Sequence, residues 1–259
     1  MTNTNPIGLF DSGIGGTSIW AAIHELLPHE NTIYLADSKN APYGQKSKDE
    51  IIALSFKNTE ILLEQNCKII VVACNTATTN AIKELRAKYD VPIIGIEPAI
   101  KPAALNSFTN TIGILATKGT LNSALFHQTI KKFDKTKIIE QIGHDLVTII
   151  ENGGINSPRM NELLKTYLKP MIDANIDYLV LGCSHYPYLI PQIKKLLPKH
   201  ITIIDSGDAV ARQTENILKE KNLLNSGTAP GSSVFYTNSN PTVLQSILKN
   251  NPTIIQKDF

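Results

Sequence analysis

The stretch Lys68-Ile-Ile-Val-Val-Ala-Cys-Asn-Thr-Ala-Thr-Thr79 decides the fold that the sequence predicts. An apolar run over residues 69–73 ends at Cys74 and the polar pair Asn75-Thr76, and a helical pattern follows. A continuous apolar run bounded by small polar residues is typical of a strand that is buried on both faces of a parallel sheet. The polar residues then lie at the carboxyl end of this strand, where open α/β sheets bind their ligands.

A second stretch, Tyr178-Leu-Val-Leu-Gly-Cys-Ser-His185, follows the same plan. Its apolar strand leads into Cys183, and a turn and a helix are expected after His185. Two of the three cysteines in the chain are therefore predicted to lie between a buried strand and the first turn of a helix. Cys67 lacks this context, and we interpret it as structural.

Strand-like and helical patterns alternate along all 259 residues, which predicts an α/β protein with parallel sheets. Strands are expected at residues 6–10, 32–36, 69–73, 91–96, 111–115, 137–140, 178–181, 201–204 and 233–237. Four segments recur in the same order: Gly8 matches Gly113 and Thr32 matches Lys137 at a spacing of 105 residues, and Cys74 matches Cys183 and Pro92 matches Ile201 at 109. The repeat predicts two similar doubly wound domains related by pseudo-symmetry.

The predicted first domain comprises residues 1–98 and 208–259, and the second comprises residues 99–207. The segment after Asp205 contains one long helix to about Lys221, one strand and one short helix over residues 241–248. These elements are too few to bury a core of their own, so we expect them to return to the first domain.

Composition and charge limit the class of protein. A net charge of +2 and scattered lysines do not favour a nucleic-acid partner. No apolar run approaches the roughly 20 residues that a membrane-spanning helix needs, and the amino terminus has no export signal. An odd number of cysteines in such a chain predicts reduced thiols in the cytoplasm.

The two matched cysteines indicate acid/base chemistry. Backbone N–H groups and the helix dipole favour an anion at a helix N-terminus, so we expect the thiol pKa to be lowered there. Two thiols that face each other from related domains suit proton transfer on opposite faces of one substrate, as the inversion of a stereocentre requires. Either cysteine alone is more simply a small buried hydrophobic residue, but the matched pair favours function.

The glycine-rich turn over residues 11–16 follows the first strand but lacks the dinucleotide-binding pattern G-x-G-x-x-G, because Ser18 occupies the third glycine position. Asp11 and Ser12 can bind the charged groups of a small zwitterion, or they can cap the following helix. Tyr43, in the loop after the second strand, either covers the site or is a partly exposed aromatic residue in a turn.

His185 can orient the Cys183 thiolate or share in proton transfer. No cluster of Cys and His accompanies it, so no metal site is predicted. His144 beside Asp145 is the only other histidine in a plausible loop. No phosphate cradle and no lysine in a Schiff-base context is recognisable, so any racemisation by this chain is expected to need no cofactor.

The sequence resembles the glutamate racemases of the cofactor-independent aspartate/glutamate racemase superfamily over nearly its whole length. The resemblance rests on the motifs Phe10-Asp-Ser-Gly-Ile-Gly-Gly16, Ala41-Pro-Tyr-Gly44, Val72-Ala-Cys-Asn-Thr-Ala77, Gly95-Ile-Glu-Pro98, Leu181-Gly-Cys-Ser-His-Tyr-Pro187 and Ile204-Asp-Ser-Gly-Asp208. This family has two α/β domains with the active site between them, and it converts L-glutamate to D-glutamate for peptidoglycan. The resemblance therefore implies a cytoplasmic isomerase, a small-molecule substrate and a homodimer, with no nucleic-acid or membrane partner.

The resemblance also implies roles for individual residues. Cys74 and Cys183 are the two acid/base residues, one on each face of the α-carbon. The supporting acid/base residues are Asp11, Glu151 and His185. The substrate-contacting residues are Asp11, Ser12, Pro42, Tyr43, Gly44, Asn75, Thr76, Thr117, Thr120, Ser184 and His185. The family usually has Thr where Ser184 stands; Ser keeps the hydroxyl and lacks a methyl group, so we expect activity to survive.

Three alternatives remain open from the sequence. The nearest is aspartate racemase or another member of the superfamily. A two-domain protein that closes on a small ligand without chemistry would leave the matched cysteines unexplained. A redox protein would join Cys74 to Cys183 in a disulfide.

Overall fold

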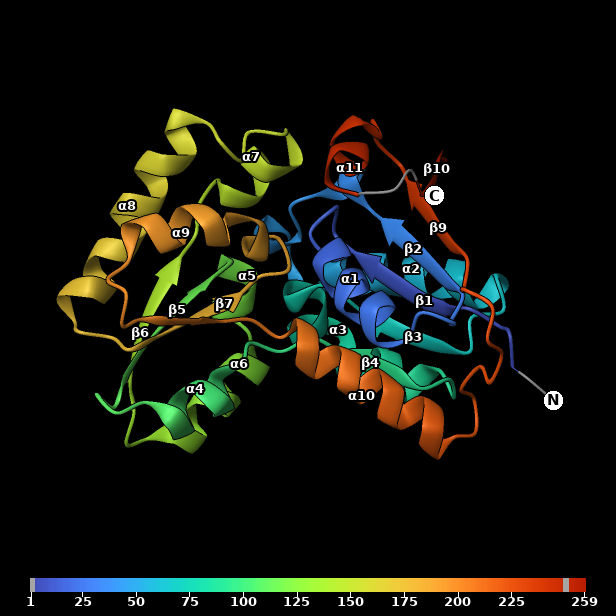
Figure 1. Ribbon diagram of the computed structural model, residues 1–259, viewed down its shortest axis with the longest axis horizontal. Helices are drawn as coiled ribbons and strands as arrows, with labels where there is room; N and C mark the ends of the chain where they lie inside the picture. Colours follow the sequence, from blue (N-terminus) through green and yellow to red (C-terminus); the bar gives the residue numbers. More distant parts are fainter. Residues whose placement is uncertain (1–2, 249–251) are drawn as a thin grey trace.

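The computed structural model describes residues 3–248 and 252–259, and the chain forms two halves that lie side by side (Figure 1). Each half is built around one parallel sheet. The first sheet has the strand order β10-β9-β2-β1-β3-β4, and the second has the order β6-β5-β7-β8. Residues 1 and 2 of the polar amino terminus, and residues 249–251 of the predicted first domain, lie outside the described residues.

The first half contains most of the first hundred residues and the last fifty. Its strands are β1 (Ile7–Asp11), β2 (Thr32–Ala36), β3 (Ile69–Val72), β4 (Ile93–Gly95), β9 (Ser233–Thr237) and β10 (Thr253–Gln256). Its helices are α1 (Thr17–Leu26), α2 (Lys48–Glu64), α3 (Asn75–Lys88), α10 (Gly207–Glu220) and α11 (Thr242–Ile247), with the short 3-10 helices η1 (Ser38–Asn40) and η2 (Tyr43–Gln45).

The second half is formed by the middle of the chain. Its strands are β5 (Thr111–Ala116), β6 (Lys137–Ile142), β7 (Tyr178–Gly182) and β8 (Thr202–Ile204). Its helices are α4 (Ile100–Asn106), α5 (Lys118–Leu121), α6 (Ala124–Ile130), α7 (Leu146–Glu151), α8 (Pro158–Asp173) and α9 (Ile190–Leu196), with the 3-10 helices η3 (Lys131–Phe133) and η4 (Tyr186–Leu189).

The strand order confirms the predicted repeat. In the first sheet β1 lies between β2 and β3, with β4 beyond β3; in the second, β5 lies between β6 and β7, with β8 beyond β7. Every strand pair in both sheets is parallel. Cys74 and Cys183 therefore follow corresponding strands, β3 and β7, which places them at the carboxyl ends of the two sheets.

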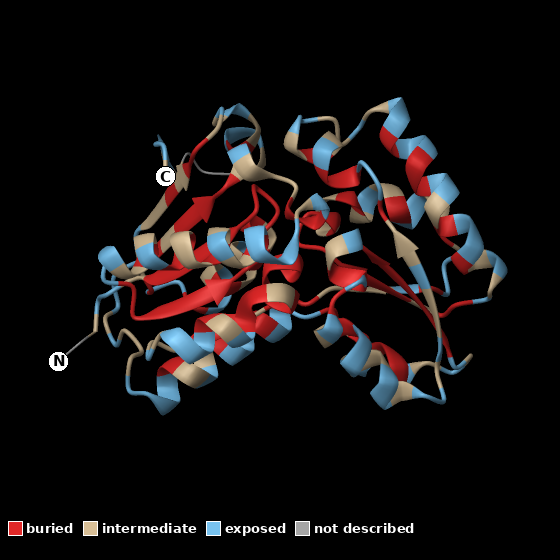
Figure 2. Cartoon of the chain, turned by 180° about the vertical axis from the view of Figure 1, so that it is seen from behind, coloured by how far each residue is buried: buried red, intermediate tan, exposed pale blue. Residues whose placement is uncertain are grey.

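Burial explains why these segments form strands. All residues of β1 and β3 are buried, as are those of β5, and helices cover the sheets on both sides (Figure 2). Ser47 begins α2 with a capping box, in which its hydroxyl accepts the N–H of Glu50 and the Glu50 carboxylate accepts the N–H of Ser47. Local sequence and burial thus support the same elements.

The segment after Asp205 returns to the first half, as predicted. Helix α10 packs against α1, and β9 pairs with β2. The edge strand β10 was not expected, because a four-residue segment with mostly exposed side chains has a weak strand pattern. The domain boundaries at residues 98/99 and 207/208 stay a prediction.

The turn and the helix expected after His185 are present, but the helical segment begins in the 3-10 conformation. A turn leads into the 3-10 helix η4, and regular α-helix starts only with α9 at Ile190. The prolines Pro187 and Pro191 fall within this segment, and proline lacks the N–H that continues a helix.

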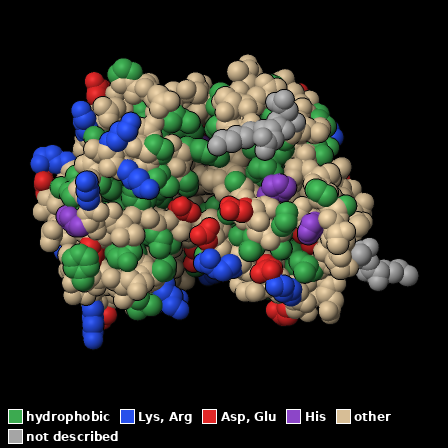
Figure 3. Space-filling model, viewed as in Figure 1, with side chains coloured by type: hydrophobic (Ala, Val, Ile, Leu, Met, Phe, Trp, Pro, Cys, Tyr) green, Lys and Arg blue, Asp and Glu red, His purple; other side chains and the backbone are tan. Residues whose placement is uncertain are grey.

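The surface agrees with the prediction that the charged side chains are scattered. Basic and acidic side chains are both scattered over the face in Figure 3, and a small acidic group lies near its centre. Among the described residues, no helix is both long enough and apolar enough to cross a membrane.

Candidate active site

One cavity of about 230 Å³ collects the predicted site residues of both halves. Both cysteines line it, together with Ser12, Pro42, Tyr43, Gly44, Asn75, Thr76, Thr117, Val147, Ser184 and His185. Asp11, Thr120 and Glu151 do not line the cavity, but each contacts a residue that does. All predicted site residues are therefore brought together.

Cys74 caps the amino end of α3. It is 4% exposed, and its Sγ accepts the N–H of Ala77 at 3.4 Å and donates to the Ser12 hydroxyl at 3.7 Å. Burial, reinforced by the negative charge of Asp11, nevertheless raises the pKa of this thiol well above its usual value. The expectation of a lowered pKa was wrong for Cys74, because removal from water outweighs the hydrogen bonds at the helix end.

Cys183 lies beside a buried histidine. The Cys183 Sγ and His185 Nδ1 atoms are 3.8 Å apart, and His185 Nε2 is 2.5 Å from Glu151 Oε1. Burial opposes a charge on His185, but the contacts to Cys183 and Glu151 and the nearby Asp11 together raise its pKa well above its usual value. The arrangement favours an imidazolium beside the second thiol, as the predicted orienting role requires.

Glu151 joins the two halves. Its Oε1 accepts the N–H of Ile14 at 2.7 Å, and its Oε2 accepts the Ser38 hydroxyl at 2.9 Å. Both partners belong to the first half, whereas Glu151 ends α7 of the second. The same carboxylate therefore fixes His185 and the glycine-rich turn.

Asp11, at the end of β1, faces the other half as well as its own helix. Its Oδ2 accepts the N–H of Gly16 at 2.8 Å, directly before α1, and its Oδ1 accepts the Ser184 hydroxyl at 3.2 Å. Burial raises the pKa of Asp11, although His185 and the Gly16 N–H oppose the shift. Ser184 thus uses the hydroxyl that it shares with the threonine more usual at this position.

Three threonine hydroxyls close the cavity between the halves. Thr76 Oγ1 lies 2.8 Å from Thr117 Oγ1 and 3.3 Å from Thr120 Oγ1, and the last two are 3.1 Å apart. Thr76 is the second residue of α3, Thr117 caps the start of α5, and Thr120 lies within α5. These hydroxyls satisfy one another here, and each can turn to an acceptor on a bound molecule.

Asn75 is the best internal sign that the cavity binds a ligand. Asn75 is 2% exposed, and neither its amide nitrogen nor its amide oxygen has a hydrogen-bond partner among the described residues. A buried polar group without a partner is costly, and it is commonly explained by a molecule that supplies the missing bonds.

Tyr43 is fully buried, so the interpretation as a partly exposed turn residue was wrong. Its hydroxyl donates to the buried carboxylate of Asp37 and accepts from the Asn58 side chain at 3.0 Å. Asp37 also accepts from Asn40 at 2.7 Å and from Asn238 at 2.5 Å. Asp37 was not identified from the sequence, although it directly follows β2, just as Asp11 lies at the end of the neighbouring strand β1. Val147 was not identified either, because no sequence pattern distinguishes this apolar residue from the others in α7.

Comparison with known proteins identifies the family. The family model described as Asp/Glu/hydantoin racemase matches residues 15–214. The chain belongs to the Asp/Glu/hydantoin racemase family. It is 46% identical to the glutamate racemase of Ralstonia pickettii over 225 residues, which cover 86% of this chain and 80% of the relative. It is 44% identical to the glutamate racemase of Pseudomonas entomophila, covering 94% and 92% of the two chains.

Solved structures of this family have the same fold. A glutamate racemase isoform from Bacillus anthracis matches with a TM-score of 0.89 and 30% identity, over 99% of this chain and 98% of the other. The glutamate racemase of Francisella tularensis, in complex with D-glutamate, matches with a TM-score of 0.86 and 30% identity over the same shares. An aspartate racemase from Picrophilus torridus is 15% identical with a TM-score of 0.61, which indicates a shared fold.

Proposed function

We propose that this chain is a glutamate racemase, an isomerase that interconverts L- and D-glutamate through two thiols without a cofactor and supplies D-glutamate for the cell wall. One observation carries the two-thiol mechanism: Cys74 and Cys183 follow corresponding strands of the two halves, are free thiols and line one cavity. The substrate is supported by well-covered relatives that are glutamate racemases.

Each turnover moves two protons. One cysteine, as a thiolate, takes the α-hydrogen as a proton and leaves its electron pair on the α-carbon, where the adjacent carboxylate delocalises it. The other cysteine, as a thiol, donates its proton to the opposite face and becomes a thiolate. The α-carbon is inverted, no group is oxidised or reduced, and the reverse reaction uses the same two residues in exchanged roles.

The neighbours of each thiol give it a role in this scheme. The raised pKa of Cys74 makes its thiolate a strong base once formed, and the Ser12 and Ala77 contacts stabilise that thiolate. An imidazolium at His185 stabilises the Cys183 thiolate across 3.8 Å, and Glu151 stabilises that imidazolium. The negative charge of Asp11 contributes to the raised pKa of Cys74 and also acts on His185, 3.9 Å away, so Asp11 supports both sides of the site.

The polar residues that do not transfer the α-proton bind the substrate. The unpartnered amide of Asn75 and the hydroxyls of Thr76, Thr117 and Ser184 can bind carboxylate oxygens. Ser12 lines the cavity where an ammonium can bind, and Asp11 lies behind it, 3.4 Å from the Ser12 hydroxyl. The centre of a water molecule can move through only about 10 Å³ of the cavity, which is room for roughly one water. Glutamate is larger, so the halves must move apart to admit it.

The first test follows L-glutamate in heavy water without added cofactor, by polarimetry and by NMR of the α-position. Loss of rotation together with deuterium at the α-carbon is expected. Failure of both would refute the proposed activity, and faster turnover of aspartate would reassign the substrate.

The cysteine variants Cys74→Ala and Cys183→Ala test the division of labour. Each should lose racemisation by at least about a thousandfold while keeping its fold, because the acid or the base on one face is missing. Each retained thiol can still exchange the α-hydrogen of the enantiomer that faces it. Unchanged racemisation in either variant would contradict the two-thiol mechanism, and a Cys74–Cys183 disulfide under mild oxidant would favour the redox alternative.

A cytoplasmic location and a homodimer remain part of the proposal. Cell fractionation tests the first, and sedimentation velocity of the purified chain tests the second.

A further inference from the structure

The thiol cavity is narrow and lined mostly by buried residues, and it shares one wall with an outer hollow. This hollow of about 340 Å³ is lined by residues of both halves, among them Lys118, Asp145 and Thr148. Four of its lining residues, Pro42, Gly44, Thr117 and Val147, also line the thiol cavity. These four shared residues form the wall between the hollow and the cavity.

The wall is thinnest where the halves meet. A Cβ atom placed on Gly44 would lie 2.8 Å from Thr117 Cβ, and one placed on Gly119 would lie 3.1 Å from Gly44 Cα. Contacts this short mean that the backbone of η2, in the first half, packs directly on the start of α5, in the second. At this seam the Thr76 hydroxyl contacts those of Thr117 and Thr120, and the Asn80 side chain donates to the Gly119 carbonyl at 3.2 Å. Among the described residues, no ion pair joins η2 to α5.

Lys118 lies over the seam. It is exposed, it is the first residue of α5, and none of the ion pairs between described residues includes it. It lines the outer hollow, and it also lines a second hollow on the other side of the seam, together with Lys46 and Lys48. Asp145 lies on the rim of the first hollow only. Lys48 is paired with Glu84 at 3.3 Å, so Lys118 and Lys46 are the cations beside the seam that make no ion pair among the described residues.

We propose that the outer hollow is the vestibule through which substrate reaches the thiols, and that Lys118 draws the dicarboxylate to the seam. The inference rests on the proposed function, because glutamate carries two carboxylates and one ammonium and is a net anion. A cation within about 10 Å of a bound or entering anion lowers its free energy, and salt weakens the effect.

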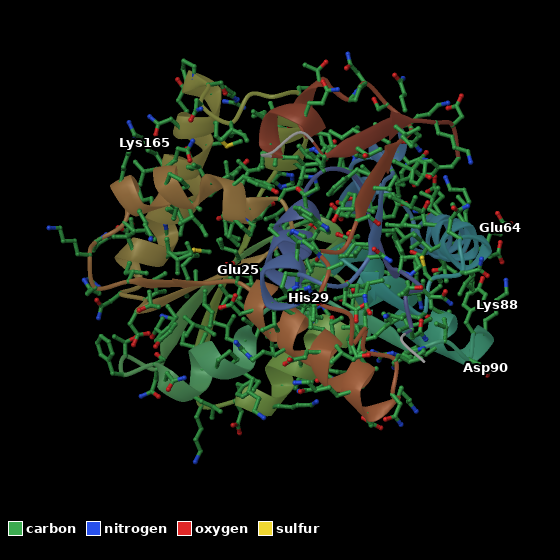
Figure 4. The ribbon with its side chains drawn as sticks, turned by 45° about the vertical axis from the view of Figure 1, so that its right-hand side comes forward. Glu25, His29, Glu64, Lys88, Asp90 and Lys165 are labelled. Atoms are coloured by element: carbon green, nitrogen blue, oxygen red, sulfur yellow. The ribbon has the colours of Figure 1, made fainter. Side chains whose placement is uncertain are left out.

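The charge is tested with Lys118→Gln. Its KM for both enantiomers should rise about two- to tenfold at about 20 mM salt, with kcat little changed, and the difference should shrink at about 500 mM salt. The matched control is Lys165→Gln: Lys165 is also exposed, and it projects from α8 on the far side of the second half (Figure 4). Asp145→Asn should change KM in the opposite direction, since it removes a like charge; asparagine tolerates the left-handed backbone of this residue, whose φ is 62°.

The route is tested with a bulky side chain in each hollow. Thr148→Trp fills the first hollow and should lower kcat/KM for glutamate by at least about tenfold if substrate passes there. Asn122 lines the second hollow but not the first, and Thr148 lines the first but not the second. Asn122→Trp therefore fills only the second hollow and should have little effect on kcat/KM.

The outcomes separate this inference from the proposed function. If the unmodified protein does not racemise glutamate, the proposed function fails. If it does, and Lys118→Gln behaves as Lys165→Gln at low salt, Lys118 has no role in capture. If Asn122→Trp is slowed and Thr148→Trp is not, the route lies through the other hollow, and the inference is overturned.

Discussion

The variant Glu151→Gln removes one charge from the site and changes little else. Glu151 accepts the N–H of Ile14 at 2.7 Å and contacts His185 Nε2 at 2.5 Å through the same oxygen. Glutamine has the same shape and retains an oxygen that accepts both bonds. The bonds from Ile14 and His185 therefore remain but lose their charge assistance, and the contact with Ser38 reverses, so that the glutamine amide donates to the Ser38 hydroxyl.

The size of the effect follows from the difference between charged and neutral hydrogen bonds. Bonds to a charged group contribute about 1.5–3 kcal/mol and neutral bonds about 0.5–1.5 kcal/mol, so the imidazolium of His185 loses about 1–1.5 kcal/mol. That loss lowers the pKa of His185. If the imidazolium stabilises the Cys183 thiolate in the transition state, kcat/KM falls about tenfold.

The assay has an internal check. Because L- and D-glutamate have the same free energy, the equilibrium constant of racemisation is one, and kcat/KM must fall equally in both directions. Circular dichroism gives the rates for each enantiomer, and the C2–H resonance of His185 gives its titration in NMR. Glu162→Gln, on the exposed face of α8, is the control for adding an amide without touching the site.

Two results would refute the reasoning. An unchanged kcat/KM with a lowered His185 pKa would mean that the imidazolium does not act on the thiol. An unchanged pKa would mean that Glu151 does not hold the charge of His185.

Three further predictions concern the rest of the chain. Burial raises the pKa of Cys67 to about 12, so Cys67→Ser should leave turnover unchanged, and the native Cys67 should resist thiol reagents at pH 8, as counted by mass spectrometry. Lys68→Met should lower the free energy of unfolding by about 3–5 kcal/mol in urea titrations, because Glu30, whose carboxylate is 2.6 Å from Lys68 Nζ, is left charged and buried; kcat should be little changed. Because its pKa is raised in the folded state, protonated His185 stabilises the fold fully below about pH 6.5, and this contribution should be lost as pH rises through the folded-state pKa. His185→Asn should flatten that part of the curve of unfolding free energy against pH. A slope equal to that of the unmodified protein would contradict the assignment.

Much of the fold was predictable because it depends on local pattern. The five apolar residues before Cys74 can be buried only in a strand covered on both faces, and the same pattern before Cys183 predicts the corresponding strand of a second sheet. The spacing of the repeated segments then predicts that both cysteines lie at carboxyl ends, and the strand orders agree. The edge strand β10 was missed because only one of its residues is even partly buried.

The electrostatics of the site was less accessible from sequence. A helix N-terminus is visible in the sequence at Cys74, and it predicts a lowered thiol pKa. How much water remains around the sulfur is set by the contact of two halves that are far apart in the chain. Burial beside Asp11 reverses the direction of the shift. The role of Asp37 in holding Tyr43 has the same origin, since Asn238 meets it from the other end of the sequence.

The sequence by itself determined the two sheets, the matched cysteines and, through its motifs, the residues that surround them. Only the tertiary structure decided which titratable groups lie close enough to change one another's pKa, because desolvation and charge act through space and not along the chain. The contacts of Glu151 with Ile14, Ser38 and His185 join segments separated by 137, 113 and 34 residues. The closed seam at Gly44 likewise exists only because the two halves meet there.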